Sequence, residues 1–170
     1  MLGALYIPIG YLALTAIPLS IYDFREHRLP NLLTYPAIAI AAVALLVVGL
    51  SGEAAKSAVG ILAGGMTFSV GYLLAKRDLV GMGDIKLLVS SNAILAAYSP
   101  VLVLVSLAIA TSLAALASLF LIGMRKINMR SPVAMGPFLL LGFFATLVLA
   151  SPWEALSLAR HPEPFRAVPW

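Results

Sequence analysis

Two aspartates are the residues of this 170-residue chain best suited to chemistry. Asp23 directly follows an apolar stretch that ends at Tyr22, and Asp84 directly precedes another that begins at Ile85. A carboxyl group at the edge of an apolar membrane segment is costly, so by default it is a candidate for function. Two carboxyls that share one proton can take a proton from water and give one to a carbonyl oxygen, which is the chemistry of peptide hydrolysis without a metal.

Two glycines stand close to Asp84, in the tetrad Gly81-Met82-Gly83-Asp84. Glycines at alternate positions free the backbone for tight turns and permit close approach by another chain or a substrate. A purely structural reading is also open, in which Asp84 is the N-cap of the helix that follows. Lys86, two positions on, either lowers the pKa of the acidic pair or is a charge that reaches the membrane interface.

The nonamer from Asp23 to Asn31 is the most polar stretch of the chain and joins two apolar segments. Pro30 and Asn31 have a simple structural role as a helix-start signal, with Asn31 as the cap. Arg25 is interpreted either as a charge that sets membrane topology or as a contact to lipid headgroups.

The composition excludes several kinds of site and partner. The chain has no cysteine, which removes disulfides and thiolate metal sites. His27 has no second histidine nearby, and one histidine is too few ligands for a metal site. We therefore predict neither a metal nor a cofactor. The net charge of +4 comes from scattered basic residues that build no continuous face, so we predict no nucleic-acid partner.

Membrane segments dominate the rest of the sequence. Hydrophobic residues make up 62%, charged residues only 11%, and the mean hydropathy is +1.03, which excludes a soluble enzyme. A membrane helix needs about 20 apolar residues. The uncharged stretch 87–124 is long enough for two helices, with the break at Ser99-Pro100. The predicted fold is an all-α polytopic membrane helix bundle of about six transmembrane segments, surrounded by lipid, and its fourth segment, Ile85 to Tyr98, is short for a full crossing.

Basic residues indicate the topology. Eight of them fall in the first, third and fifth connections, which places those connections in the cytoplasm and both termini outside. We therefore expect a multi-pass protein of the cytoplasmic membrane with both aspartates facing the cytoplasm. Residues 1–150 form the predicted transmembrane domain, and residues 151–170 a short extracytoplasmic tail. The eight are Arg25, Arg28, Lys76, Arg77, Lys86, Arg125, Lys126 and Arg130.

Three motifs in this order resemble the type IV prepilin peptidases, which are intramembrane aspartyl proteases of the GxGD type. They are Asp23 with Arg25 and Leu29-Pro30-Asn31, the Gly81-Met82-Gly83-Asp84 tetrad with Lys86, and the run Pro132-Val133-Ala134-Met135-Gly136-Pro137-Phe138.

The resemblance implies that Asp23 and Asp84 are the catalytic pair and that the substrate is a pilin-like precursor whose leader is removed. It implies an active-site loop with Gly81, Gly83 and Lys86, and a supporting motif of Arg25, Pro30, Asn31, Gly136 and Pro137. Larger bacterial members add a cysteine-rich segment and N-methylate the product. Without cysteines, this chain resembles the small, peptidase-only form.

The aspartates can meet only if the first and fourth segments pack together at their cytoplasmic ends. Gly60, Gly64 and Gly65 in the third segment form a small-residue face that lets membrane helices approach closely, and packing is the role we assign to them. Two other classes of function stay open at this point. One is a small transporter or channel subunit that uses Asp23 and Asp84 for protons or cations, and the other is a structural protein in which the two acids cap helices.

Overall fold

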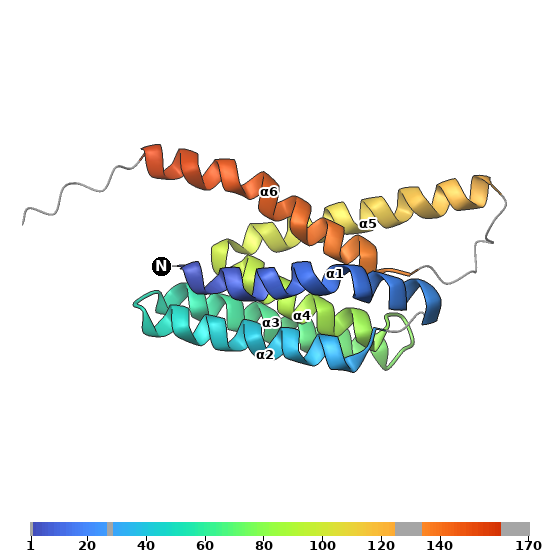
Figure 1. Cartoon of the computed structure of the whole chain (residues 1–170), viewed down its shortest axis with the longest axis horizontal. Coiled ribbons are helices and arrows are strands. Elements are labelled where there is room, and N and C mark those ends of the chain that lie inside the picture. Colours follow the sequence, from blue (N-terminus) through green and yellow to red (C-terminus); the bar gives the residue numbers. More distant parts are fainter. Residues whose placement is uncertain (1, 27–28, 125–133, 161–170) are drawn as a thin grey trace, which may run out of the picture.

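The fold is known from a computed structural model, which describes residues 2–26, 29–124 and 134–160. The described chain is helical and has no strand, as predicted. Its elements are η1 (Leu2–Leu5), α1 (Tyr6–Glu26), α2 (Asn31–Leu50), α3 (Ala54–Ala75), α4 (Met82–Tyr98), α5 (Pro100–Gly123) and α6 (Gly136–Arg160). The helices run along one common direction of the molecule (Figure 1).

Four of the described helices are long and apolar enough to cross a membrane: Gly3–Glu26, Asn31–Leu50, Ala54–Ala75 and Pro100–Gly123. Their outward side chains are apolar, since Leu14, Leu32 and Leu50 are 81%, 82% and 90% exposed. Lipid must cover such surfaces. The chain is therefore a multi-pass membrane protein. α6 runs from Gly136 to Arg160, so the expected domain boundary at residue 150 falls inside this helix.

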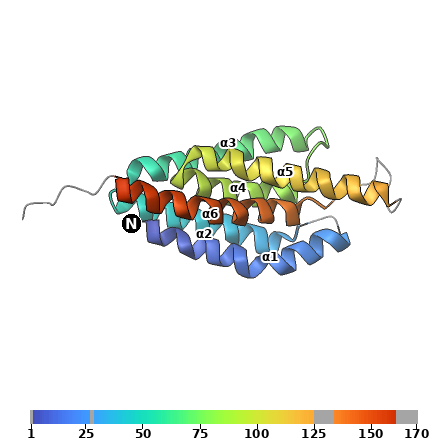
Figure 2. The same ribbon diagram turned by 90° about the horizontal axis from the view of Figure 1, so that it is seen from above.

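The short fourth helix lies at the centre of the bundle. α4 has 17 residues and packs against α2, α3, α5 and α6. Every residue from Ser90 to Ala97 is buried. In both views α4 runs among the other helices (Figures 1 and 2). It ends at Tyr98, and α5 begins at Pro100, which confirms the break predicted from Ser99-Pro100.

Glycines on α3 allow its close contact with α4. A Cβ atom at Gly60 would lie 2.7 Å from the carbonyl oxygen of Ala93, and one at Gly64 would lie 3.2 Å from the Ala93 Cβ. Gly71 meets Ile85 in the same way, with a distance of 2.6 Å. The expected packing role is therefore confirmed for Gly60 and Gly64. It is wrong for Gly65, where a Cβ would meet nothing within 4 Å.

Several helix ends gather at one end of the bundle, the end on which the polar residues of interest lie. The C-terminal ends of α1 and α3 and the N-terminal ends of α2, α4 and α6 point that way (Figure 1). Pro18 lies inside α1 and removes one helical hydrogen bond. The helix bends in this region in both views (Figures 1 and 2), and the bend directs its last turns, which carry Asp23, toward the rest of the bundle.

Candidate active site

A polar pocket at this end brings Asp23 and Asp84 together. It has a volume of about 400 Å³ and receives residues from α1, α2, α4 and the connections between them. The two acids therefore share one cavity although α1 and α4 have no extensive interface with each other. The pocket is lined by Asp23, Leu29, Asn31, Gly81, Met82, Gly83, Asp84 and Lys86.

Asp23 is held by the start of α6. Its side chain is buried, with 4% exposure, and its Oδ2 accepts a hydrogen bond of 2.8 Å from the backbone N–H of Gly136. That N–H belongs to the first residue of α6, where the helix dipole favours a negative charge. A Cβ at Gly136 would lie 2.9 Å from Oδ2 of Asp23, so only glycine allows this contact without a shift. The hydrogen bond fixes the position and orientation of the Asp23 carboxyl group.

Asp84 lies in the first turn of α4, outside the four membrane-spanning helices. Its Oδ1 is buried and has no hydrogen-bond partner within the described chain. Burial, and to a lesser degree the negative charge of Asp23, raises the pKa of Asp84 from 3.8 to about 6. Its structural reading as an N-cap is wrong, because Gly81 occupies the cap position in an extended conformation and no side chain caps the helix.

Leu29 lies between the start of α4 and the start of α6. It is buried, with its Cβ 2.8 Å from the position that a Cβ would take at Gly83. Its Cδ2 lies 3.3 Å from the corresponding position at Gly136. Leu29 thus packs against both glycines and couples the starts of α4 and α6. We did not predict a role for it, and the signal in the sequence was only its place beside Pro30 and Asn31.

Lys86 is bound by α2. Its Nζ donates a hydrogen bond of 2.6 Å to Oδ1 of Asn31 and lies 4.2 Å from the centre of the Tyr35 ring. The expectation that Asn31 caps α2 is wrong, because Pro30 is at the cap position and the Asn31 side chain is used by Lys86. Tyr35 was missed by the sequence analysis. It lies one helical turn after Asn31, on the same face of α2.

A sequence model of the type IV leader peptidase family matches residues 10–119. This stretch is more than half of the chain and includes both Asp23 and Asp84. The chain belongs to the type IV leader peptidase family. It is accordingly a membrane-embedded protease. The matched residues end before Gly136 and Pro137, so the contact between α6 and Asp23 lies outside them. The curated proteins and the solved structures give no match to the chain.

The remaining predicted residues of the leader peptidase fall into three groups. Arg25 is exposed in the last turn of α1, and Pro137 is buried in the first turn of α6; neither lines the pocket. Gly83 and Lys86, expected on a loop, lie inside α4, and Gly81 immediately precedes it. His27, Arg28 and the start of the third motif, Pro132-Val133, lie outside the described residues.

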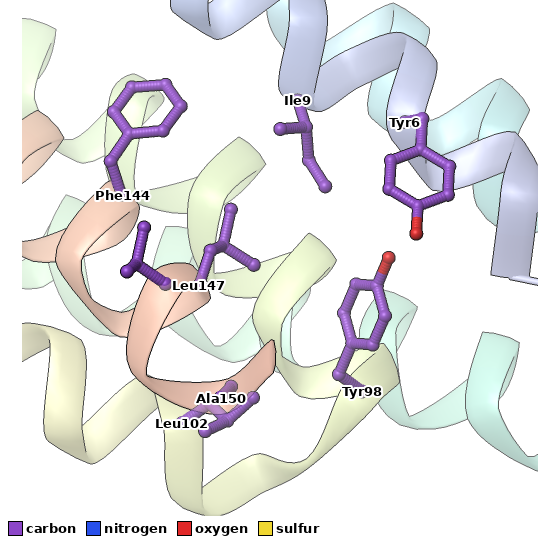
Figure 3. Close-up of a pocket in the computed structure, with 8 residues that line it drawn as sticks. Tyr6, Ile9, Tyr98, Leu102, Phe144, Leu147 and Ala150 are labelled. Atoms are coloured by element: carbon purple, nitrogen blue, oxygen red, sulfur yellow. The ribbon is translucent and has the colours of Figure 1, made fainter. Parts of the chain in front are cut away.

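A second cavity, of about 310 Å³, is at the opposite end of the leader peptidase. Figure 3 shows that the hydroxyls of Tyr6 and Tyr98 point toward one another there, beside apolar residues of α1 and α6 such as Ile9 and Leu147. Asp84 and Tyr98 are at opposite ends of α4, about 20 Å apart at 1.5 Å per residue. The described residues that line this cavity include no Asp, Glu, His, Lys or Arg, so among them there is no pair of carboxyl groups such as the one in the polar pocket.

Proposed function

We propose that this leader peptidase is an intramembrane aspartyl endopeptidase with Asp23 and Asp84 as its catalytic pair, and that it removes the N-terminal leader from type IV pilin-like precursors. The observation that carries the proposal is that the two carboxyl groups, supplied by α1 and α4, line one pocket in two different environments. Asp23 accepts an N–H hydrogen bond, whereas Asp84 is half-buried and its buried Oδ1 has no partner in the described structure.

These environments support different roles for the two acids. Asp23, whose carboxyl group is oriented by the Gly136 N–H, takes a proton from a water molecule as that water attacks the carbonyl carbon of the scissile bond. Asp84, whose raised pKa keeps it protonated up to about pH 6, gives its proton to the carbonyl oxygen. The tetrahedral intermediate then collapses when the proton held by Asp23 passes to the amide nitrogen, and Asp84 recovers its own proton from the intermediate. One acid is ionised and one protonated at the beginning and at the end of the cycle.

The position of the pocket fits a substrate that is part leader and part membrane helix. The pocket lies where the membrane-spanning helix Gly3–Glu26 ends and Asn31–Leu50 begins, so the apolar helix of a precursor can lie in the bilayer beside the bundle. The described basic residues Arg25, Lys76 and Arg77 are at this same end, and the positive-inside rule assigns it to the cytoplasmic side. The leader would then remain in the cytoplasm, and the protein in the cytoplasmic membrane.

Transport is less well supported than proteolysis. A pathway for protons or cations requires ionisable groups at intervals across the bilayer. Both Asp23 and Asp84 are at one end of the bundle, and the described middle turns of the membrane-spanning helices contain no acid.

The test is co-expression of the protein with a candidate prepilin encoded in the same genome, followed by a gel assay for loss of the leader. Asp23→Asn and Asp84→Asn should each abolish processing, because each removes one partner of the proton exchange, while the protein remains in the membrane. Processing by both variants at the parental rate would refute the aspartyl mechanism.

Matched controls are two acids at the same end of the bundle that do not line the pocket. Glu26 and Asp78 are exposed, so Glu26→Gln and Asp78→Asn remove a negative charge near the site without touching it. Asp78 has φ = 54°, a conformation that asparagine also tolerates. Both control variants should process the precursor at the parental rate.

A further inference from the structure

We propose that Asn31 and Tyr35 hold the ammonium group of Lys86 in the pocket as the cation that binds a backbone carbonyl oxygen of the peptide substrate. The inference rests on the proposed function and deepens it. Lys86 is the binding residue, and Asn31 and Tyr35 are positioning residues that act through it.

The clamp on Lys86 uses two side chains from one face of α2. Asn31 and Tyr35 are separated by one helical turn, so their side chains are neighbours. Oδ1 of Asn31 accepts an N–H at 2.6 Å, and the ring of Tyr35 lies against the ammonium at 4.2 Å from its centre. A lysine side chain is otherwise flexible and loses much rotamer entropy when it binds. The clamp therefore holds the cation in place before the ligand arrives.

The charge of Lys86 is not neutralised by a carboxylate of the described chain. The described ion pair joins Lys56 to Glu53, in the turn at the start of α3. Asp23 receives the Gly136 N–H, and the pKa of Asp84 responds to burial and to Asp23. An ammonium group has three N–H donors, and Asn31 accepts from one of them. Lys86 thus retains a donor and a full positive charge in a pocket that it shares with both aspartates.

The acceptor that matches this donor is a main-chain carbonyl oxygen. A peptide that enters the pocket presents a carbonyl at every residue, and a hydrogen bond from an ammonium group to it is charge-assisted and strong. A basic side chain of the leader would instead be repelled by Lys86. Gly81, which is exposed and lines the pocket, adds no side chain to it and so leaves room for a peptide backbone, whereas Leu29 occupies the space beside Gly83. The fixed cation therefore orients the peptide backbone between Lys86 and the aspartates.

A similar pair elsewhere in the chain provides a matched control. Lys76 lies over the ring of Tyr72 at 4.7 Å, one helical turn away on α3 and at the same end of the bundle. Neither residue lines the pocket. Substitutions of Lys76 or Tyr72 remove a cation–π contact or a lysine charge at the same end of the bundle without affecting the ammonium group of Lys86.

The experiment measures binding of a synthetic peptide, a short basic leader followed by an apolar segment, to the full chain in lipid nanodiscs. All variants carry Asp84→Asn so that the peptide stays intact. Lys86→Met should weaken binding about tenfold, the effect of losing one hydrogen bond to a charged group. Tyr35→Leu should weaken it about threefold, and Tyr35→Phe, which keeps the ring, should restore it. Lys76→Met and Tyr72→Leu should bind like the parent.

Asn31→Asp separates a binding role from a structural one. The new carboxylate keeps Lys86 in place through an ion pair, but it also neutralises the charge of Lys86. Peptide binding should therefore fall although thermal stability does not. Parental binding by Asn31→Asp and Lys86→Met would overturn the inference, and so would a parent that does not bind the peptide. If the Lys86 series changes binding as expected but the protein with both aspartates never cleaves the peptide, the proposed function fails and the binding role of Lys86 stands.

Discussion

The backbone N–H of Gly136 donates a hydrogen bond of 2.8 Å to Oδ2 of Asp23, although 113 positions separate the two residues in the sequence. The contact joins the last turns of α1 to the first residue of α6. Because α1 and α4 share no extensive interface, the geometry of the acidic pair depends on this link and on Leu29, which packs against both Gly136 and Gly83.

Gly136→Ala should therefore reduce leader cleavage. The added Cβ would lie 2.9 Å from Oδ2 of Asp23 and 3.3 Å from Cδ2 of Leu29, so the carboxylate has to move. A displacement of a catalytic group by about 1 Å lowers the rate by up to about 100-fold. The rate is measured on a leader peptide at saturating concentration. Gly10→Ala, where a Cβ meets nothing within 4 Å on the same protein, should leave that rate unchanged.

The close contact between α3 and α4 makes a prediction about stability. Gly60→Ala places a Cβ 2.7 Å from the Ala93 carbonyl oxygen and 2.8 Å from Leu45, both of which are buried. Overpacking of this kind costs about 1–3 kcal/mol of unfolding free energy. Gly65→Ala meets no atom and should gain up to about 1 kcal/mol, because alanine is the better helix former. Thermal unfolding in detergent compares the two variants, and equal stabilities would contradict the packing of α3 on α4.

The raised pKa of Asp84 predicts how cleavage depends on pH. If Asp84 supplies the proton, the active form is lost as pH rises through about 6, and the rate should fall about tenfold per pH unit above that value. The measurement is a pH–rate profile of kcat/KM with the aspartates intact. A rate that stays constant from pH 6 to pH 8 would exclude Asp84 as the proton donor in the free enzyme.

The same shift predicts a pH-dependent effect on stability that needs no activity assay. Folding raises the pKa of Asp84 above its unfolded value, so the folded protein binds the extra proton between about pH 4 and pH 6. The contribution of Asp84 to the free energy of unfolding is fully present below pH 4 and is lost as the pH rises through 6. Asp84→Asn removes the buried charge and should therefore be more stable than the parent at pH 7.5, by on the order of 2–3 kcal/mol. At pH 4 the two should unfold alike.

The sequence was sufficient for the fold class and for the pairing of the two acids. The uncharged stretches and Ser99-Pro100 predicted the helices and the break between α4 and α5, because these depend on local composition. The positions of Asp23 and Asp84 at the ends of apolar segments were enough to make them candidates.

The contacts of the site needed the three-dimensional structure. Asn31 has the residue type and position of a helix cap, but its side chain instead accepts a hydrogen bond from Lys86, 55 positions away in the sequence. Leu29 and Tyr35 are ordinary apolar and aromatic residues in the sequence, and their roles depend on what α4 and α6 place beside them. Gly65 matched the small-residue pattern, but it faces away from α4.

The burial of α4 has a consequence for how the protein is made. A helix of 17 residues with an acid and a lysine near one end and Ser90, Ser91 and Asn92 in its middle partitions poorly into lipid when it leaves the translocon alone. The Ser90 and Ser91 hydroxyls already bond to the carbonyl oxygen of Leu87, which lowers the cost only in part. α4 is thus expected to enter the bilayer as a hairpin with α5. The pocket that contains Asp84 would then be assembled only after the ribosome has translated well past that residue.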